Sequence, residues 1–432
     1  MIKGAEFLGA DALWAQQHEA WGAQRNHVAQ NSSFYQALWG GKPPPRDLRD
    51  LPELPLSDKS QLRDSQAASP PFGDYLAAPR DLATRLHRTS GTTGQAMNLA
   101  LSRRDCEITA AVGGRSHRAA GLGPQHTVVH CLNYRMWMGG VTDHLTLEAT
   151  GALVVPFGVG NTELLVQTIQ EVGITAISCT PSYPAVLERV IRERFPKLQP
   201  RDLGLKLGLF GGEPGLDDPA LRARLSETWG MAPRNANYGV SDVLSNFAAQ
   251  CEHDLSLHFL ASDVLWPELV DSDTQSPLPV QAGQKGELVL THLVRDCQPL
   301  VRFRTGDIIR VTETDPCRCA RTGFRFRVVG RSDDMVTVRG LNLFPSMVAA
   351  VLSEMPELSG NYRIMLDGPP PYDHLPLHVE CAAGVPDTAE LTERVAAAIK
   401  QKLGATSRVT LLAAGSLPLT EGKTKHVIRS HP

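Results

Sequence analysis

One stretch of the chain has the residue types of a phosphate-binding loop, Arg88-Thr-Ser-Gly-Thr-Thr-Gly-Gln95. Hydroxyl side chains alternate there with glycines, so backbone amides and hydroxyls can both approach and wrap a polyphosphate. The Gly-Lys-Ser/Thr ending that brings a lysine to the phosphates of a Walker A loop is absent, so a cation must come from elsewhere. A surface loop rich in glycine and hydroxyls is the alternative interpretation.

Six further segments follow this loop along the chain. They are Phe210–Pro214, Tyr238–Asp242, Arg302–Asp307, Gly330–Asp334, Arg339–Pro345 and Glu421–Lys423. Together with the loop they resemble the adenylate-forming enzymes, and within them the phenylacetate-CoA ligase family, whose shorter members share the forms Gly-Arg-Ser-Asp-Asp and Arg-Gly-x-Asn-x-Phe-Pro. The resemblance covers the chain from about Leu86 to the C-terminus.

The resemblance implies an ATP-dependent, AMP-forming ligase that uses ATP, Mg²⁺ and coenzyme A. The acid would attack the α-phosphate of ATP, and the thiol of coenzyme A would then attack the acyl-adenylate. Such catalysis is mostly positioning plus neutralisation of charge on the phosphoryl oxygens. An aromatic acid is the expected substrate: an arylacetate, a benzoate-like or an anthranilate-like acid. Two alternatives stay open, namely transfer to a carrier-protein phosphopantetheine or other nucleophile, and a non-catalytic nucleotide-binding relative.

The same resemblance assigns roles around the nucleotide. Tyr238 is expected to lay its ring against adenine, with Gly239 leaving room for the backbone. The carboxylate of Asp307 is expected to accept hydrogen bonds from both ribose hydroxyls, with Arg331 on the ribose or phosphate side. The other residues expected to contact ATP or AMP are Thr89, Ser90, Gly91, Thr92, Thr93, Gly94, Gly212, Glu213, Pro214 and Ser241.

Three residues are expected to act in catalysis, Thr89 in the loop, Asp242 and Lys423. Asp242 stands where the family usually has a glutamate that helps to hold Mg²⁺. It is one methylene shorter, so its metal contact would run through water. Lys423 matches the lysine that the C-terminal domain inserts at the α-phosphate, where a flexible ammonium suits a group that comes and goes. Taken alone, Lys423 would be a solvated tail residue.

Movement of the C-terminal domain between the two half-reactions is also implied, with Asp333 as the hinge. In the second orientation Arg339 and Gly340 would face the thiol acceptor, because glycine leaves space for a slender pantetheine arm. Ordinary turn and capping chemistry offers other roles for two carboxylates. Asp307 could be a β-turn residue, and Asp333 could cap a helix.

The segment Asn133-Tyr-Arg-Met-Trp-Met-Gly-Gly140 resembles the family segment that borders the acid. Its large apolar side chains suit a flat slot for an aromatic ring. Core packing is the alternative role for each of them. Arg135, in place of a small residue, indicates a polar or second acidic group on the substrate. The residues expected to line the pocket are Tyr134, Arg135, Met136, Trp137, Met138 and Gly139.

Cysteine and histidine spacing predicts a metal site. Three thiolates and one imidazole form a closed tetrahedral set, which is typical of structural zinc. The resemblance supports this set, although Ala320 replaces a glycine that usually follows the Cys-x-Cys pair. His253 is a competing ligand, and free thiols in a β-rich region are the alternative. The favoured ligands are Cys251, His258, Cys317 and Cys319.

The elements that must position these residues predict an α/β fold. Short apolar runs alternate with helical segments from Leu86 to Gly239, as in a sheet covered by helices on both faces. Leu255 to Val329 reads as a more antiparallel β region. We expect a large N-terminal domain over 1–330, beginning with a packing arm over 1–60, and a small mobile α+β domain over 331–432. The helices predicted by residue pattern are Ala10–Gln24, Ser33–Leu38, Thr162–Val172, Tyr183–Arg194 and Thr388–Leu403.

Composition excludes several classes of partner. The 432 residues carry a formal net charge of −3, so no broad basic field is available for a nucleic-acid backbone. No stretch approaches the roughly 20 apolar residues that span a bilayer. The eight cysteines are sparse, which fits a reducing compartment and predicts a cytoplasmic location. The resemblance implies an aromatic acid, ATP and coenzyme A as partners, and composition predicts no nucleic-acid or membrane partner. A homodimer is one assembly to test.

Overall fold

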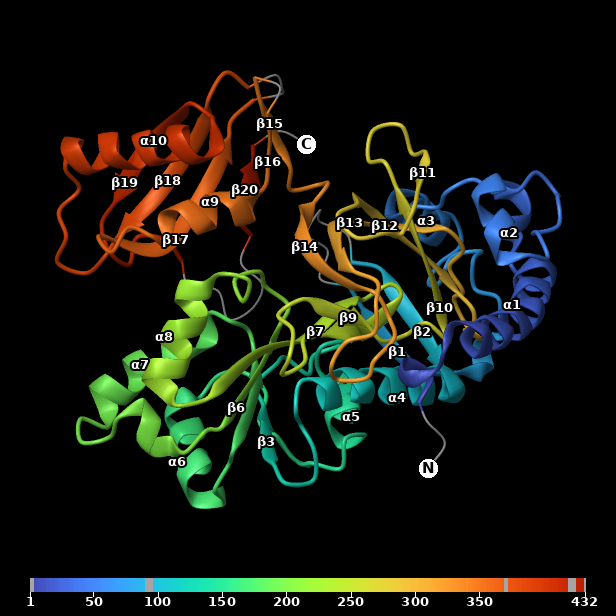
Figure 1. Ribbon diagram of the computed structural model, residues 1–432, viewed down its shortest axis with the longest axis horizontal. Coiled ribbons are helices and arrows are strands. Elements are labelled where there is room, and N and C mark those ends of the chain that lie inside the picture. The colour runs from blue at the N-terminus through green and yellow to red at the C-terminus, as the bar shows by residue number, and fades with distance from the viewer. Residues whose placement is uncertain (1–3, 90–95, 340, 369–371, 419–424, 431–432) are drawn as a thin grey trace.

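The computed structural model describes residues 4–89, 96–339, 341–368, 372–418 and 425–430 (Figure 1). A large lobe contains the elements up to β14, and a smaller C-terminal lobe contains β15 to β20. Seven of the predicted site residues lie outside the described residues, namely Ser90, Gly91, Thr92, Thr93, Gly94, Gly340 and Lys423.

The first residues form a helical arm on the large lobe. α1 begins at Ala10 as predicted but continues to Asn31, beyond the predicted end at Gln24. The helix extends because Val28 lies on the same buried side as Trp21. Ser32 then caps α2 (Ser33–Leu38) by accepting a hydrogen bond from the Tyr35 amide. The capping box of α3 (Lys59–Ala68) similarly fixes the start of that helix.

The parallel half of the main sheet agrees with the predicted alternation of strands and helices. Its strand order is β4-β3-β5-β6-β7. Alternate strand residues face opposite sides: Val129 and Ile177 pack against α6, α7 and α8, while Val128 packs on the side of α4 and α5. The bounds predicted for α6 and α7 are confirmed. The elements are β3 (Thr127–His130), β4 (Leu153–Pro156), β5 (Ala176–Cys179), β6 (Leu207–Gly211), β7 (Ala232–Val240), α4 (Arg103–Ala119), α5 (Val141–Glu148), α6 (Thr162–Val172), α7 (Tyr183–Arg194) and α8 (Pro219–Trp229).

β7 joins the parallel half to an antiparallel half. It pairs in parallel with β6 and antiparallel with β8. The two predicted β regions are therefore one continuous sheet, with twelve strands among the described residues. The antiparallel strands are β8 (Leu244–Ala249), β9 (Leu257–Phe259), β10 (Leu265–Val270), β11 (Pro277–Leu278), β12 (Lys285–His292), β13 (Phe303–Glu313) and β14 (Arg325–Arg331).

A separate hairpin flanks the predicted phosphate loop. β1 (Ala83–Arg88) pairs antiparallel with β2 (Asn98–Ser102). The amide of Arg88, at the end of β1, donates to the carbonyl of Met136 at 2.8 Å. One end of the predicted phosphate loop is thereby attached to the segment predicted to border the acid.

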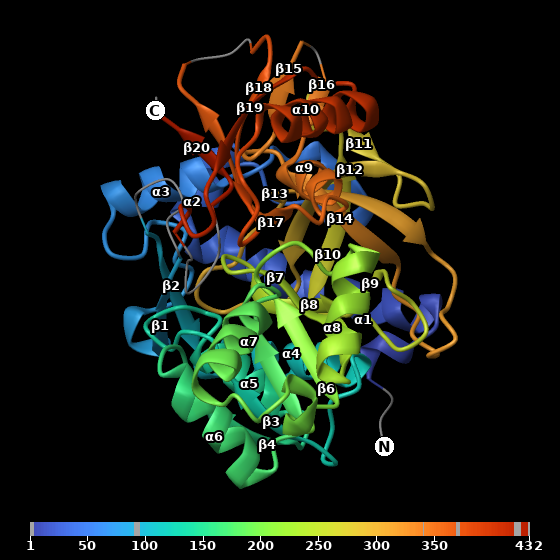
Figure 2. The same ribbon diagram turned by 90° about the vertical axis from the view of Figure 1, so that its left-hand side faces the viewer.

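The C-terminal lobe has its own sheet, ordered β19-β18-β17-β20, and its own apolar core. β18, α10 and β19 form a β-α-β unit around the predicted C-terminal helix, with α10 capped by Thr388 and ended by Gly404 at φ 72°. Both ribbon views place this lobe beside β14 (Figures 1 and 2). Its elements are β15 (Val336–Val338), β16 (Leu341–Leu343), α9 (Pro345–Leu352), β17 (Leu358–Leu366), β18 (Leu375–Cys381), α10 (Ala389–Leu403), β19 (Ser407–Leu412) and β20 (Val427–Arg429).

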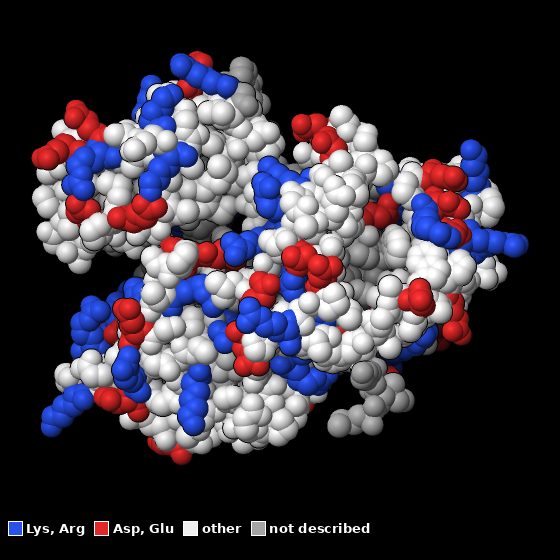
Figure 3. Space-filling model, in the orientation of Figure 1, with Lys and Arg blue, Asp and Glu red and all other residues white. Residues whose placement is uncertain are grey.

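The surface between the lobes is hollowed on the face drawn in Figure 3, and acidic and basic side chains are interspersed there. Within the described ranges, we find no helix that is both long and apolar enough to cross a bilayer.

Candidate active site

A buried carboxylate lies where β14 meets the C-terminal lobe. Asp307, on β13, accepts a 2.7 Å hydrogen bond from Tyr238 Oη and a 2.7 Å hydrogen bond from Arg331 Nη1. Residue 306 must be glycine here, because its φ is +76° and an added Cβ would lie 2.8 Å from Arg331 Nη2. Both oxygens of Asp307 therefore have a donor, and its charge is balanced by a guanidinium.

Arg331 also reaches the residue predicted to be the hinge. Its Nε and Nη2 donate to the two carboxylate oxygens of Asp333 at 2.8 and 3.1 Å. Arg429, on β20, donates to the backbone carbonyl of Asp333 at 3.3 Å. Three residues predicted separately, Asp307, Arg331 and Asp333, thus form one charged network at the junction of the two lobes.

Tyr238 contacts protein groups on several sides. Its ring lies edge-on to Phe247 and Phe326, with centroids 5.3 Å away in each case. Burial and then the charge of Asp307 hold the pKa of Tyr238 well above its ordinary value. The phenol therefore stays neutral and acts as a hydrogen-bond donor to Asp307. Contact between this ring and adenine remains a prediction.

Asp242 has an ion-pair partner that the sequence did not indicate. Its side chain is 4% exposed, and its Oδ2 accepts from Lys59 Nζ at 2.8 Å. Its Oδ1 is buried and has no partner among the described residues. Lys59 is the first residue of α3, so the N-terminal arm brings a cation to the carboxylate predicted to bind Mg²⁺. No motif marks this lysine, because it lies 183 residues from Asp242 along the chain.

The described part of the predicted nucleotide slot is set by backbone geometry. Thr89 is 2% exposed, and its Oγ1 accepts from the amide of Met97 at 3.0 Å. Gly212 has φ +80°, and the adjacent Glu213 accepts from Ser182 Oγ at 2.7 Å. Pro214 and Ser241 are the remaining described positions of the predicted slot, and Pro214 is exposed whereas Ser241 is partly exposed.

Gly239 is required by strand packing. A Cβ at this position would lie 2.0 Å from the carbonyl oxygen of Ser245 on β8. The close approach of β7 and β8 therefore explains the glycine without a nucleotide. Room for adenine, the predicted reason, is not needed to account for it.

The segment predicted to border the acid divides into exposed and buried positions. Met136 is 53% exposed, and Arg135 is exposed beside it. Trp137 and Gly139 are partly buried, and Tyr134 Oη lies 3.0 Å from His144 Nδ1. Met138 is only 2% exposed and packs with Leu99 and Leu101 on β2. Met138 therefore packs in the core, which is the alternative that the sequence left open for it.

Two histidines that the sequence analysis missed hold the backbone of this segment through its carbonyl groups. His87 Nδ1 lies 3.2 Å from the carbonyl oxygen of Met136, and His130 Nε2 lies 2.9 Å from that of Gly139. A carbonyl oxygen can only accept a hydrogen bond, so His87 carries a proton on Nδ1 and His130 carries one on Nε2. Burial lowers the pKa of His130 to about 4, so it is neutral near pH 7. His87 fixes the backbone at Met136, which adopts φ 52°, and His130 fixes the backbone at Gly139.

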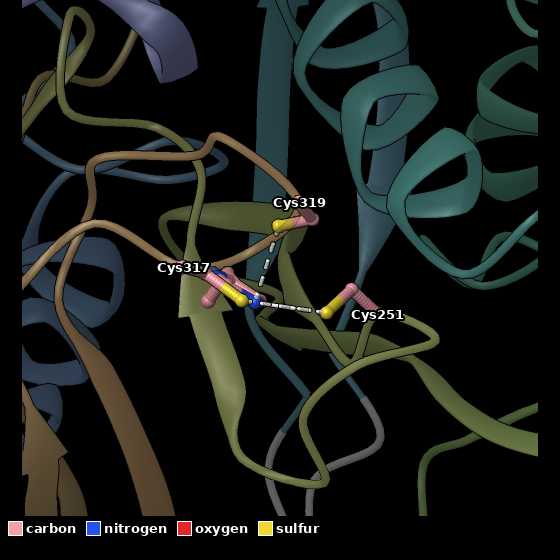
Figure 4. Close-up of side chains that lie close together, drawn as sticks. Cys251, Cys317 and Cys319 are labelled. Carbon is pink, nitrogen blue, oxygen red and sulfur yellow. Dashed lines mark hydrogen bonds between the residues drawn. The ribbon is translucent and has the colours of Figure 1, made fainter.

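The four predicted metal ligands lie close together near β8 and β9. Cys251 follows β8, His258 lies on β9, and the two other cysteines lie between β13 and β14. The sulfurs of Cys251, Cys317 and Cys319 point toward one another (Figure 4). One ligand atom from each of the four residues lies within 4.8 Å of the others. His253 is not in this group, since its side chain lies 3.4 Å from Glu252 and is 39% exposed.

Distances within this group suit a tetrahedral ion. Cys251 Sγ lies 3.9 Å from Cys317 Sγ and 3.3 Å from His258 Nε2. Zn–S bonds of about 2.3 Å place two sulfurs of a tetrahedron about 3.8 Å apart. Burial lowers the pKa of His258 to about 4, which leaves its imidazole neutral, as a ligand must be.

On the C-terminal lobe, Arg339 is the described residue of the predicted acceptor side. Its amide donates to the Tyr372 carbonyl at 3.0 Å, its φ is +48°, and its guanidinium lies 3.7 Å from the carboxylate of Asp373. The side chain is 65% exposed, so it is accessible to an anionic ligand.

Comparison with known proteins places this geometry in a family. The family model of AMP-binding enzymes matches residues 28–292, and the model of the AMP-binding enzyme C-terminal domain matches residues 340–430. A phenylacetate-coenzyme A ligase of Thermus thermophilus is 34% identical over 96% of this chain and 96% of its own length. A phenylacetate-coenzyme A ligase of Pseudomonas putida is 33% identical over 99% of this chain and 96% of its own.

Solved structures add a conformational comparison. A 2-hydroxyisobutyryl-CoA ligase in its postadenylation state is 29% identical, covers 99% of this chain and 91% of its own, and has a TM-score of 0.87. The same ligase in its thioesterification state, covering 98% and 91%, has a TM-score of 0.71. The lobes described above are therefore arranged more like the postadenylation state. By sequence, by fold and by the order of its motifs, the chain belongs to the phenylacetate-CoA ligase family of AMP-binding enzymes.

Proposed function

We propose that the chain is an ATP-dependent, AMP-forming ligase that joins an aromatic carboxylic acid to coenzyme A. The carboxylate attacks the α-phosphate of ATP and releases pyrophosphate, and the thiol of coenzyme A then attacks the acyl-adenylate and releases AMP. The observation that carries this proposal is the charged network at the lobe junction, in which Asp307, Arg331 and Asp333 connect a buried carboxylate to the start of the C-terminal lobe.

In this proposal, Asp307 binds the ribose hydroxyls and the loop that contains Thr89 binds the phosphates. A carboxylate that already holds two donors can exchange one of them for a ribose hydroxyl. Lys423 approaches the α-phosphate from the C-terminal lobe. Asp333 is the pivot from which that lobe turns, presenting Arg339 and Gly340 to the thiol. The TM-scores of 0.87 and 0.71 against two states of one relative support such a rotation.

Asp242 is the residue that would hold Mg²⁺. Its buried Oδ1 without a partner fits a cation or a metal-bound water. When bound, the ion neutralises charge on the phosphate oxygens. Lys59 keeps the other oxygen of Asp242 paired and thereby orients the carboxylate.

The decisive test is acid-dependent exchange of radiolabelled pyrophosphate into ATP, using a panel of arylacetates and benzoates. The proposal expects exchange with at least one aromatic acid. Lys423→Ala should lower it strongly while acid binding persists. Pyrophosphate exchange with none of these acids, despite binding of ATP, would instead indicate a non-catalytic relative. AMP release with a phosphopantetheinylated carrier protein but not with coenzyme A would change the acceptor.

We further propose that Cys251, His258, Cys317 and Cys319 hold a structural zinc ion, supported by the sulfur–sulfur and sulfur–nitrogen spacings. Elemental analysis of the purified protein should find about one equivalent of zinc. Cys319→Ser should lose the metal and lower the unfolding temperature. Cys106→Ser, at a similarly half-buried cysteine outside the cluster, is the matched control. Less than about half an equivalent in the folded wild-type protein would refute this proposal.

All eight cysteines lie within the described residues and none of them forms a disulfide, which supports a reducing compartment such as the cytoplasm. Light scattering on the purified chain tests whether it forms a homodimer.

A further inference from the structure

A hollow of about 350 Å³ lies at the amino ends of β6 and β7, beside the cysteine cluster. Glu252 supplies the one carboxylate among the described residues that line it. Four lining residues are cations that come from different parts of the chain, namely Arg118, Lys206, Arg234 and Arg321. We call this cavity the basic hollow, because positive charge exceeds negative charge in its lining.

The four cations of the basic hollow are not used in ion pairs. Arg115, three residues before Arg118 on α4, shows that the fold can pair an arginine here, since its guanidinium lies 2.6 Å from the carboxylate of Asp263. Arg325 similarly lies 3.0 Å from the carboxylate of Asp254. Within the described residues, no such pair joins any of the four lining cations to a carboxylate.

Several hydrogen-bond donors of these cations are therefore available to a ligand. The Nε atoms of Arg234 and Arg321 are buried without a partner among the described residues. Arg234 otherwise donates to the carbonyl of Pro233, at 3.2 Å. The side chain of Lys206 is exposed. An arginine has five N–H donors and a lysine has three, so most of this capacity is unused.

The cations are also close enough to repel one another. Burial, together with the charges of Arg115 and Arg321, lowers the pKa of Arg118, although Glu6 acts in the opposite direction. Burial and then the charge of Lys206 lower the pKa of His126, which lines the same hollow. A bound anion would relieve this repulsion, because it places negative charge between the cations.

The cysteine cluster offsets only part of the positive charge. Cys251 and Cys319 line the basic hollow as well as belonging to the proposed zinc site. A zinc ion held by three thiolates and one imidazole carries a single net negative charge. That charge and the carboxylate of Glu252 balance two of the four cations. The two positive charges that remain match a phosphate dianion.

The basic hollow is separate from the proposed nucleotide site. Arg234 and Tyr238 lie four residues apart on β7, so a strand rise of about 3.3 Å per residue places them about 13 Å apart. Ligands of open α/β sheets usually bind at the carboxyl ends of the parallel strands, where Tyr238 lies. The basic hollow is at the opposite ends of β6 and β7.

We propose that the basic hollow is a second binding site, which takes a small anion that carries one or more phosphate groups. Guanidinium groups form forked hydrogen bonds to phosphate oxygens, and a lysine adds a mobile point charge. Ligand pockets start at about 300 Å³, so the hollow has room for a small phosphorylated molecule. The inference goes beyond the proposed ligase reaction and does not depend on it.

The experiment is calorimetric titration of the full chain at low ionic strength. Inorganic phosphate, pyrophosphate and ribose 5-phosphate are titrated separately, so that the arms distinguish a free inorganic anion from a phosphorylated organic molecule. We expect at least one of them to bind, and Lys206→Met and Arg234→Gln should each weaken its Kd by about tenfold or more. Arg192→Gln, at an exposed arginine of α7 outside the hollow, is the matched control and should leave the Kd unchanged.

Pyrophosphate can also occupy the proposed nucleotide site, so the loss of affinity in the two variants identifies the basic hollow. Equal affinity in wild type, Lys206→Met and Arg234→Gln would overturn the inference, and so would the absence of binding by all three anions. If Arg234→Gln does not fold, Lys206→Met still carries the test, because its side chain is exposed. Binding that both variants lose, in a protein that shows no pyrophosphate exchange with any acid, would support the inference and refute the proposed ligase.

Discussion

Two neighbouring residues of β7 send their side chains to two very different carboxylates. Tyr238 donates to Asp307, whose charge is balanced by Arg331, whereas Asn237 donates to Asp143, which has no cation among the described residues. The protein itself balances the charge of Asp307, whereas it does not balance the charge of Asp143 within the described residues. A carboxylate whose charge is balanced stays ionised and can hold hydrogen-bond donors, as the proposed binding of ribose by Asp307 requires. A buried carboxylate without such a cation lowers the stability of the fold once it ionises.

Asp242 is intermediate between these two. One oxygen is paired with Lys59 and the other is buried without a partner among the described residues. The three buried carboxylates thus differ in how far the protein compensates their charge: fully for Asp307, partly for Asp242 and least for Asp143. The contrast predicts that removing them will have different effects on catalysis and stability.

The largest effect is expected from Asp307→Ala. It removes the carboxylate that we propose accepts hydrogen bonds from both ribose hydroxyls, and it leaves Arg331 without its partner, so we expect adenylation to lose about 3–6 kcal/mol of stabilisation, at least a hundredfold in rate. Pyrophosphate exchange at saturating acid measures this, with circular dichroism as the control for folding. A loss smaller than fivefold would contradict the role of Asp307.

The next effect concerns stability and pH. The pKa of Asp143, about 7, lies above its unfolded-state value. The contribution of Asp143 to the free energy of unfolding is therefore full below the unfolded-state pKa of about 4, and it is lost as the pH rises through about 7. Asp143→Asn removes this loss. The free energy of unfolding of the variant, relative to that of wild type, should therefore rise by about 2–4 kcal/mol between pH 4 and pH 8. Urea unfolding at both pH values measures the gain.

Asp307→Asn is the matched comparison for this second prediction. It removes a charge that Arg331 and Tyr238 already satisfy, so the variant should be destabilised at pH 8. If the two variants changed stability in the same direction at pH 8, the difference between the two carboxylates would be refuted.

Lys59→Met tests the intermediate carboxylate. It leaves Asp242 buried without its cation, and we expect a loss of about 1–2 kcal/mol in the free energy of unfolding. Added Mg²⁺ should raise the unfolding temperature of this variant more than that of wild type, because the ion replaces the missing charge. Lys42→Met, at an exposed lysine of the same arm, should change neither quantity. Equal responses to Mg²⁺ would argue against a cation site at Asp242.

The smallest effect is expected from Tyr238→Phe. Arg331 still holds Asp307, so loss of the phenol should cost about 1 kcal/mol, roughly fivefold in the KM for ATP. The turnover number should change less than the KM, because the ring remains packed between Phe247 and Phe326. A change confined to the turnover number would show that the hydroxyl acts in chemistry rather than in positioning.

Local pattern was sufficient for many elements and for the family. The helices Thr162–Val172 and Tyr183–Arg194 have the predicted bounds because apolar periodicity and the flanking residues, such as Gly173, act over a few positions. The four metal-site candidates were also named from spacing, and His258 rather than His253 lies among the cysteines. For Met138 the sequence left pocket lining and core packing both open, because the side-chain type alone does not tell a pocket from a core, and the structure places it in the core.

The sequence by itself determined the order of the motifs, the α/β class and the residue types available for nucleotide chemistry, since these depend on short-range propensity and on a colinear pattern. Only the tertiary structure decided which charges are compensated. Lys59 meets Asp242 across 183 residues, and Asn237 meets Asp143 across 94. Such pairs form because sheet registry and helix packing bring distant segments together, and burial then makes each missing partner energetically significant.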